Sequence, residues 1–526
     1  MEFDSTLAKE LNLGMFKAYD IRTQVKLLDD TLSRRLILSV GRYFKEVLHV
    51  RTVVLGRDAR LGAPHLMQLT LDLFPAMGFE VLVNPLQEST CLFYFSCMQH
   101  PGAAAVMFTA SHNPGQYIGM KILAPVMQPV AMGCGPAGGL SCIRDFYLEN
   151  VPSAFPGTGS VKIVRYLDRY VEYSMRLAKV GKGDLAGVPI LADFLCGGAG
   201  VDVALAFDIA GARLTSRNLV PDGQFPAGDP NPIIISSIQP TWDAMKQGSF
   251  AFGFCYDGDG DRMDLMDSTG NQVAPGFNMV VLAPEIKALY QQAYGQGIFS
   301  GAWNPQIYSD VKAIPTAMVE LARTGLGVHL IRNGHSFIKE ELLTNFSRQY
   351  LAASEESAHY YMNFPLDVDD WSKGFAATEN TLFFTLLTAR MWATRPKRYE
   401  QMIERQNQVH RIREWPCYFN TAPEQMERVL ADVERDMVAR GATLIKRMDD
   451  GSDLDAALMR FGLPAVIDAS TEISGDWCQV SHRISRSEDA MTRWEVVAGS
   501  QRICDEMNDA IRTITDRYVA SGYAHY

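Results

Sequence analysis

The sequence predicts an α/β protein with three similar α/β domains on mainly parallel mixed sheets, followed by a C-terminal α+β domain. Three observations lead to this prediction. The chain has 526 residues, of which 47% are hydrophobic, enough for several buried cores. Apolar strand patterns alternate with helix-period patterns three times, which favours parallel sheets covered by helices. After residue 395 the alternation stops and a different pattern begins.

The first strand and helix series covers the N-terminal part of the chain. Helix-period apolar positions in 31–49 precede the strand TVVLG at 52–56, a helix from about 63, the strand FEVLV, a further helix and the strand AAAVMFT. Because strands and helices alternate, the strands are expected to lie mainly parallel. The Gly- and Pro-rich segment 124–140 is expected to be a loop.

Two more series follow, and then the pattern changes. GVPILADF, a helix at 201–210 and FAFGFCY form the second series; QIYSDVK, a helix at 315–324 and GVHLIR open the third, which closes with a helical stretch at 374–391. Beyond it we expect helices at 423–440 and 501–518 with short strands between them. The predicted domains are residues 1–158, 159–267, 268–395 and 396–526.

Composition excludes several classes of protein. The 60 acidic and 49 basic side chains give a formal charge of −11, which disfavours broad binding of nucleic acid or anionic lipid. The N-terminal residues lack the pattern of a secretion signal, and no apolar run reaches the roughly 18 residues of a membrane span. Nine cysteines without a CxxC pair are typical of reduced thiols. We therefore expect a cytoplasmic protein.

An acidic loop, Asp257-Gly-Asp-Gly-Asp-Arg262, directly follows the apolar strand FAFGFCY. Ligands of open α/β sheets bind at such strand ends, and the glycines let the three carboxylates converge on a hard cation such as Mg²⁺. A calcium EF-hand would need Gly at its sixth and Glu at its twelfth position, where this chain has Arg262 and Ser268. The remaining alternative is a solvated Asp-Gly turn.

A displayed hydroxyl follows another apolar strand, in Thr109-Ala-Ser111-His112-Asn-Pro114. The GxSxG pattern of a serine hydrolase is absent from these residues. Taken by itself, Ser111 could equally be a helix cap or a turn residue.

Together these two motifs resemble the α-D-phosphohexomutase superfamily. The residues from Thr109 to Lys121 are similar to its phosphoserine signature TASHNPxxYNGxK, and the acidic loop is similar to its metal motif DGDGDR. The segment FKAYDIR at 16–22 resembles FRAYDIRG of the phosphomannomutase/phosphoglucomutase branch, while GRDAR at 56–60 and PDGQFP at 221–226 also match. The resemblance thus spans the chain almost end to end, and implies domains around a central active-site cleft.

Three later segments extend the resemblance. NGHSFIK at 333–339 is similar to the family's TGHSxIK, and EESAH at 355–359 to its sugar-recognition motif GEMSGH. The segment RISRSE at 483–488 stands where the family has the phosphate loop RxSNTEP or RxSGTEP. Arg486 replaces a small or amide residue and Asp489 replaces Pro, so this loop departs from the family pattern.

The resemblance assigns roles to residues of this chain. Catalytic roles fall on Ser111, Lys121, His112, Arg262 and His335. One Mg²⁺ per active site is expected on Ser111, Asp257, Asp259 and Asp261. Sugar phosphate binding is expected from Tyr19, Arg22, Lys312, Asn333, Gly334, Glu355, Ser357, His359, Arg483, Ser485, Arg486 and Ser487.

The implied reaction interconverts hexose 1-phosphate and hexose 6-phosphate, with mannose or glucose as the sugar. A phosphorylated Ser111 would pass its phosphoryl group to the sugar. The resulting hexose 1,6-bisphosphate, which is also the activator, would reorient in the active site and return its other phosphoryl group to Ser111. The expected partners are small sugar phosphates, without nucleic acid or membrane, for a monomer or homodimer.

Three alternatives remain at this point. A phosphoglucosamine mutase would share the chemistry, but that branch usually begins with an FGTDGIRG-like segment. A binding paralogue without turnover is motivated by the altered phosphate loop and by Ile118 and Ala358, where the family prefers Asn and Gly. A phosphatase would use the same serine and metal but expose the phosphoserine to water.

Overall fold

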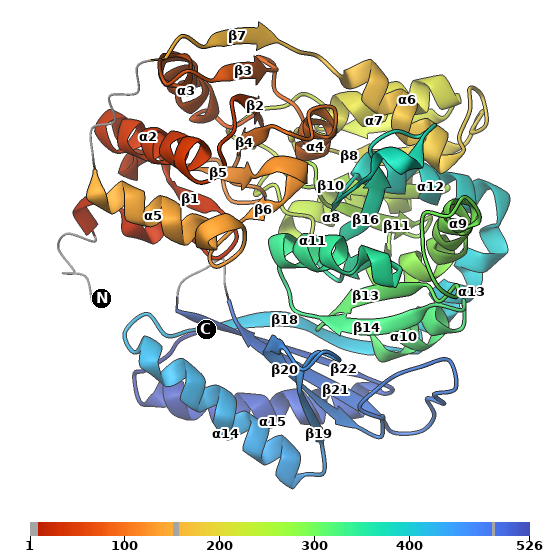
Figure 1. Cartoon of the computed structure of the whole chain (residues 1–526). Coiled ribbons are helices and arrows are strands. Elements are labelled where there is room, and N and C mark those ends of the chain that lie inside the picture. Colours follow the sequence, from red (N-terminus) through yellow and green to blue (C-terminus); the bar gives the residue numbers. More distant parts are fainter. Residues whose placement is uncertain (1–8, 151–156, 486–489) are drawn as a thin grey trace. The chain divides into compact units, whose positions relative to one another are not determined.

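The structure is a computed structural model that describes residues 9–150, 157–485 and 490–526. The chain divides into two compact units, coloured by sequence in Figure 1. The first contains residues up to Gln272 together with 335–344 and 357–394; the second contains 273–334, 345–356 and 395–526. Mixed sheets with covering helices and a separate antiparallel C-terminal sheet confirm the predicted fold class. The predicted domain boundaries stay predictions.

The first sheet of the first unit carries Ser111. Its strands are β1 (Ile21–Gln24), β2 (Thr52–Arg57), β3 (Glu80–Val83), β4 (Ala104–Phe108), β5 (Tyr117–Leu123), β6 (Pro129–Val130) and β7 (Ser160–Ile163). They lie in the order β1-β5-β4-β2-β3-β7, with β6 paired to β5. The associated helices are α2 (Asp30–Glu46), α3 (Ala63–Ala76), α4 (Thr90–Met98) and α5 (Leu140–Glu149). Helices α2, α3 and α5 pack their apolar faces on this sheet in one core that includes Leu36, Val53, Phe74 and Tyr147.

The second sheet carries the acidic loop. Its strands are β8 (Pro189–Asp193), β9 (Arg213–Arg217), β10 (Phe252–Tyr256), β11 (Met263–Asp267) and β12 (Gln272–Val273), in the order β12-β11-β10-β8-β9. Its helices are α6 (Leu167–Ala178), α7 (Gly200–Ala210) and α8 (Ile235–Gln247). Every residue of β10 is buried. This explains the unbroken apolar run, since a strand that is covered on both faces has no polar face.

The first unit also holds α11 (His335–Thr344), the antiparallel pair β16 (His359–Pro365) and β17 (Phe375–Glu379), and α12 (Thr381–Thr394). The single helix expected at 374–391 is therefore wrong in its first turn. Residues 375–379 form a strand because they pair with β16 from Phe375 opposite Pro365 to Glu379 opposite Tyr361. Pairing with a distant strand outweighs local helix preference here.

The second unit contains strands β13, β14 and β15 and the C-terminal sheet. Strand β13 (Gln306–Asp310) lies parallel to both β14 (Gly327–Ile331) and β15 (Tyr350–Glu355). The helices are α9 (Pro275–Gly295), α10 (Pro315–Ala322) and α13 (Pro396–Gln406).

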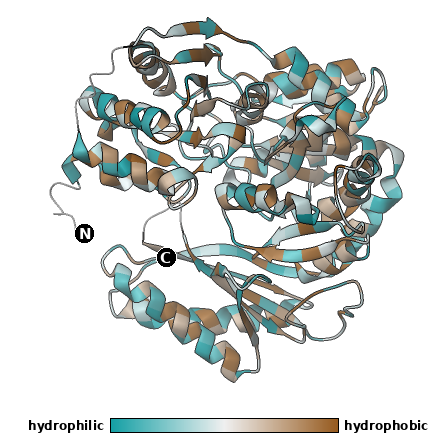
Figure 2. Ribbon diagram, viewed as in Figure 1, coloured by the Kyte–Doolittle hydropathy of each residue, from teal (hydrophilic) through white to brown (hydrophobic). Residues whose placement is uncertain are grey.

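The C-terminal sheet is antiparallel throughout. Its strands β18 (His410–Tyr418), β19 (Thr443–Arg447), β20 (Asp453–Phe461), β21 (Cys478–Ile484) and β22 (Met491–Ala498) lie in the order β18-β22-β21-β20-β19. Helices α14 (Met426–Ala439) and α15 (Gln501–Ala520) share one core with it. Figure 2 shows both helices with mixed hydrophobic and hydrophilic residues; α14 buries Val429, Val433 and Met437 at a spacing of four. Among the described residues, no helix is both long and apolar enough to cross a membrane.

Candidate active site

Ser111 lies in the serine turn, the loop 109–116 that connects the antiparallel strands β4 and β5. Its φ of 52° places a non-glycine residue in the left-handed region, a strained conformation that clusters at functional sites. The backbone N–H of Ser111 donates to the Thr109 hydroxyl at 2.8 Å, and its own hydroxyl lies 3.0 Å from Nδ1 of His112. The side chain is only 2% exposed. The turn therefore holds a strained, buried serine beside an imidazole.

Arg60 holds the serine turn in place through hydrogen bonds, a role that was not predicted from the sequence. Its guanidinium is fully buried and donates to the carbonyl oxygens of Ser111, Asn113 and Pro114 at 2.6–2.8 Å. Asp58 accepts from Nε of Arg60 at 3.1 Å and from the Thr109 hydroxyl at 2.6 Å. Asp58 and Arg60 both belong to the GRDAR segment, and their hydrogen bonds hold the serine turn in place.

The acidic loop joins β10 to β11, which are antiparallel neighbours. One oxygen of Asp257 accepts the backbone N–H groups of Asp261 and Arg262, both at 3.1 Å, and thereby closes the loop. Gly260 has φ of 73°, which favours glycine. A Cβ on Gly258 would lie 2.8 Å from the Ser111 carbonyl oxygen. Glycine at 258 thus permits the close packing of the acidic loop against the serine turn.

Lys121 links the two motifs electrostatically. Its Nζ lies 2.7 Å from Asp259 and 2.5 Å from Asp261, and all three side chains are buried. Burial disfavours the ammonium, but the two carboxylates outweigh it and raise the pKa of Lys121 well above its usual value. Burial and the charges of Asp261 and Asp259 raise the pKa of Asp257. For Asp261, burial is outweighed by Lys121 and Arg262, which lower its pKa.

The three carboxylates are suited to a cation. One ligand oxygen from each of Asp257, Asp259 and Asp261 lies within 4.8 Å of the others. Each also keeps one buried oxygen, Oδ2 of Asp257 and Oδ1 of Asp259 and Asp261, without a hydrogen-bond donor among the described residues. Buried carboxylate oxygens without donors are costly unless a cation satisfies them. The acidic cluster could therefore bind a metal ion.

A layer of charged residues lies behind the acidic loop. Nε of Arg262 donates to Nε2 of His359 at 3.0 Å. Because arginine stays protonated, Nε2 is the acceptor and the neutral ring carries its proton on Nδ1. Lys339 donates to Glu379 at 3.1 Å and to the Tyr94 hydroxyl at 3.0 Å. Burial raises the pKa of Glu379 to about 7 although Lys339 opposes this. No role for Glu379 was predicted from sequence.

The structure places Tyr19, Arg22 and His335 in the same unit as Ser111. Arg22 pairs with Asp20 and donates to the Asn113 side chain at 2.7 Å, beside the serine turn. The rings of Tyr19 and His335 meet edge to face at 5.8 Å. Burial, and then the charges of Lys339 and Lys121, lower the pKa of His335 well below its usual value. His335 is accordingly neutral in this setting.

The second unit brings together the predicted sugar-binding residues Asn333, Gly334 and Glu355. The Asn333 amide donates to Glu355 at 3.0 Å and to Asp310 at 2.9 Å, and the N–H of Gly334 donates to Glu355 at 3.3 Å. Lys312 lies 3.7 Å from Asp310. The EESAH segment at 355–359 is divided between the two units. Glu355 belongs to the second unit, whereas Ser357 and His359 belong to the first.

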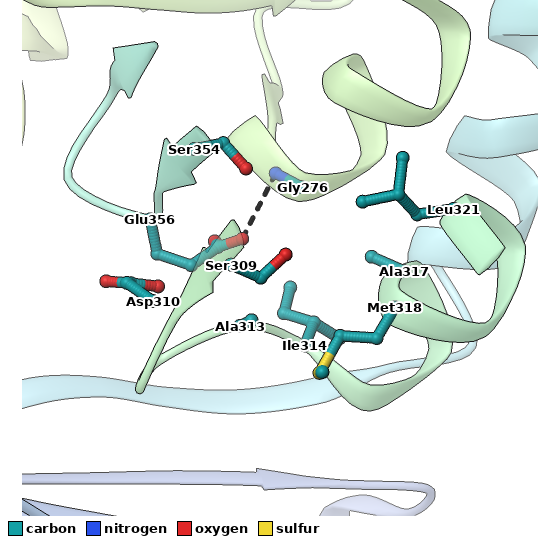
Figure 3. Close-up of a pocket in the computed structure, with 10 residues that line it drawn as sticks. All are labelled: Gly276, Ser309, Asp310, Ala313, Ile314, Ala317, Met318, Leu321, Ser354 and Glu356. Carbon is teal, nitrogen blue, oxygen red and sulfur yellow. Dashed lines mark hydrogen bonds between the residues drawn. The ribbon is translucent and has the colours of Figure 1, made fainter. Parts of the chain in front are cut away.

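A small cavity lies behind this segment. Figure 3 shows Glu356 accepting from the N–H of Gly276, at 3.1 Å, beside the hydroxyls of Ser309 and Ser354. The cavity holds about 10 Å³, which is room for one water molecule rather than a ligand. The rest of its lining is largely apolar and includes Ile314, Met318 and Leu321.

The predicted phosphate loop is only partly described. Arg483 lies at the end of β21, where it contacts the carboxylate of Glu414 at 2.9 Å. The N–H of Ser485 donates to the Met491 carbonyl at 2.9 Å. Arg486 and Ser487 lie outside the described residues. Sequence reasoning missed Glu414, because nothing in its local sequence connects it with residue 483.

The chain is similar in sequence to known proteins. Residues 14–129 and 165–270 match the family models of phosphoglucomutase/phosphomannomutase α/β/α domains I and II. The chain is 29% identical over 410 residues to "Phosphohexose mutases" of Xanthomonas campestris, covering 77% of this chain and 82% of the relative. It is 30% identical over 364 residues to an Escherichia coli phosphomannomutase, covering 66% of this chain and 73% of the relative.

The fold also resembles a solved structure. A phosphoglucomutase/phosphomannomutase family protein from Burkholderia thailandensis superposes with a TM-score of 0.73 at 22% identity, covering 97% of this chain and 98% of that one. On the combined strength of the sequence and fold similarities, this chain belongs to the phosphoglucomutase/phosphomannomutase family.

Proposed function

We propose that this protein is a hexose phosphate mutase that moves a phosphoryl group between the 1 and 6 positions of mannose or glucose through a phosphorylated Ser111. One observation carries the proposal. The strained Ser111 turn packs on the acidic loop at Gly258, and Lys121, which follows the turn, pairs with Asp259 and Asp261. Phosphoryl transfer depends mainly on positioning and charge neutralisation, and this cluster supplies both.

The metal is proposed to be Mg²⁺, held by Asp257, Asp259, Asp261 and the Ser111 side chain. Carboxylate oxygens suit a small hard cation, and the donor-free oxygens of the three aspartates give it ligands. When bound, the ion would neutralise charge on the transferring phosphoryl group.

The chain's own residues manage protons and the remaining charge. Nδ1 of His112 lies 3.0 Å from the Ser111 hydroxyl and can accept its hydrogen bond, because burial and the charge of Arg262 lower the pKa of His112 and favour the neutral ring. Lys121 keeps its proton on Nζ and is the acid nearest the carboxylates. Arg262, with Nε 3.7 Å from Asp257, adds a permanent positive charge.

Sugar phosphate binding is proposed for the residues that the family resemblance assigned to it. Tyr19, Arg22, Ser357 and His359 contribute from the first unit. From the second come Lys312, Asn333, Gly334, Glu355, Arg483 and Ser485, with Arg486 and Ser487 as predicted from sequence. Transfer of the phosphoryl group from Ser111 to the sugar forms a hexose 1,6-bisphosphate. This intermediate reorients in the active site before its other phosphoryl group returns to Ser111. A trace of this bisphosphate should therefore activate the enzyme. A cytoplasmic location and a monomeric or dimeric state remain predictions.

The test follows 6-phosphate formation from mannose, glucose or glucosamine 1-phosphate, with Mg²⁺ and a trace of hexose 1,6-bisphosphate. Ser111→Ala should lower the rate of 6-phosphate formation at least about 10³-fold, because the hydroxyl that carries the phosphoryl group is gone. Ser39→Ala is the matched control, since Ser39 is a buried hydroxyl of the same unit that donates to the Arg35 carbonyl.

Each outcome separates the candidates. Fastest turnover of mannose or glucose phosphate supports the proposal, and fastest turnover of glucosamine phosphate makes the protein a phosphoglucosamine mutase. Free sugar with inorganic phosphate would indicate a phosphatase. Binding of sugar phosphate without any product would indicate a paralogue that has lost turnover.

A further inference from the structure

Two arginines face each other on neighbouring interior strands of the C-terminal sheet. Arg483 on β21 and Arg493 on β22 are directly opposite in the antiparallel register. Like charges in this position repel and destabilise a strand pair. A neighbouring group must therefore compensate them.

Glu414 supplies the compensating charge. The register between β18 and β22 shifts between Ile412 and Trp415, and Glu414 lies within this bulge. A bulge re-aims a side chain, here toward both arginines. One Glu414 oxygen lies 2.9 Å from Nη2 and 3.1 Å from Nε of Arg483; the other lies 3.1 Å from Nη1 of Arg493. The Nε and Nη2 contacts fix the plane of the Arg483 guanidinium.

The charge balance of this cluster suits a phosphate. Burial opposes ionisation of Glu414, but Arg483, Lys312 and Arg493 outweigh it and lower its pKa to about 2. Arg483 and Arg493 against the one Glu414 carboxylate leave a surplus of one positive charge, while Lys312 lies 3.7 Å from Asp310. A phosphomonoester carries a charge of about −2 at neutral pH. The surplus positive charge can therefore attract a phosphate dianion while Glu414 stays in place.

We propose that Glu414 is a positioning residue for phosphate binding, which orients Arg483 and Arg493 and remains between them when the phosphate of a sugar phosphate binds. This inference rests on the proposed function, and it adds Glu414 and Arg493 to the residues predicted from sequence. Because the non-reacting phosphate binds equally in the ground and transition states, losing its support should raise KM and spare kcat.

The experiment compares the full-length wild type with Glu414→Gln and Glu414→Asp. Mutase kinetics give KM and kcat, and calorimetric titration with inorganic phosphate gives a dissociation constant that needs no turnover. Glu414→Gln should raise both KM and the phosphate dissociation constant about tenfold, with kcat changed less than about threefold. Glu414→Asp keeps the charge and should recover part of the loss. It also tests the proposal if the Gln variant does not fold.

Glu320→Gln is the matched control. The Glu320 carboxylate also lies between two arginines of the second unit, Arg323 at 3.0 Å and Arg405 at 3.8 Å. This variant should leave both constants unchanged. Unchanged or tighter phosphate binding in Glu414→Gln, or a fall in kcat at constant KM, would overturn the inference. A wild type without mutase activity whose phosphate binding still depends on Glu414 would overturn the proposed function alone.

Discussion

The acidic cluster of the first unit and the basic cluster of the second are built on the same principle with opposite sign. In the first, Lys121 lies between Asp259 and Asp261. In the second, Glu414 lies between Arg483 and Arg493. Each cluster gathers like charges around one opposite charge that does not fully balance them. The comparison teaches that the uncompensated sign is the basis of both proposals, a cation for the first cluster and an anion for the second.

The strongest test of the comparison is Asp259→Asn. It removes a charge from the proposed cation site, and we expect kcat/KM to fall at least about 10³-fold because transition-state charge is no longer neutralised. Asp202→Asn is the control, since Asp202 is another buried carboxylate of the first unit and accepts a hydrogen bond from the Ser89 hydroxyl. Equal activity of the two variants would contradict a metal role for the acidic loop.

The compensating role of Lys121 can be tested by unfolding. Lys121→Met leaves Asp259 and Asp261 without their buried partner and should lower the free energy of unfolding by about 3 kcal/mol in metal-free buffer. Saturating Mg²⁺ should stabilise this variant more than the wild type, because the ion takes over the lost compensation. Urea unfolding with and without Mg²⁺ measures both effects. An identical Mg²⁺ increment in the two proteins would argue against the comparison.

A third test concerns the ion triad beside the basic cluster. Arg411 bridges Glu356, at 3.0 Å, and Glu495 of β22, and both carboxylates are almost fully buried. Glu495→Gln should cost about 2 kcal/mol of unfolding free energy, since a charged hydrogen bond becomes a neutral one. Glu506→Gln, which breaks an exposed pair with Arg502, should cost less than about 0.5 kcal/mol. Denaturant titration of both variants decides whether the buried triad stabilises the second unit.

The smallest expected effect concerns Asp310, which lies beside Lys312. Burial raises the pKa of Asp310 to about 7, although Lys312 opposes the shift. The folded state therefore holds a proton that the unfolded chain releases near pH 4, so stability should fall as pH rises from about 4 to 7. Asp310→Asn should reduce the decline between pH 6 and 7 by about 1 kcal/mol. Asp505→Asn, at an exposed position of α15, should leave the decline in stability unchanged. If Asp310→Asn also kept the wild-type pH profile of stability, the assignment of this titration to Asp310 would be refuted.

The first cluster could be predicted from the sequence because its groups are contiguous. Asp257, Asp259 and Asp261 share one loop, and Ser111 and Lys121 share one hairpin. Apolar strands preceding both motifs placed them at strand ends. The roles of Arg60 and Glu379 could not be predicted, because each depends on a partner many residues away.

The sequence by itself determined the alternation of strands and helices, the fold class and the two contiguous motifs, since local periodicity and short spacing encode them. Only the tertiary structure decided that residues 375–379 form β17, that Arg60 fastens the serine turn, and that Glu414 lies between Arg483 and Arg493. The physical reason is the same in each case. Strand register, a bulge and burial bring together residues far apart in the chain, and no local pattern records those pairings.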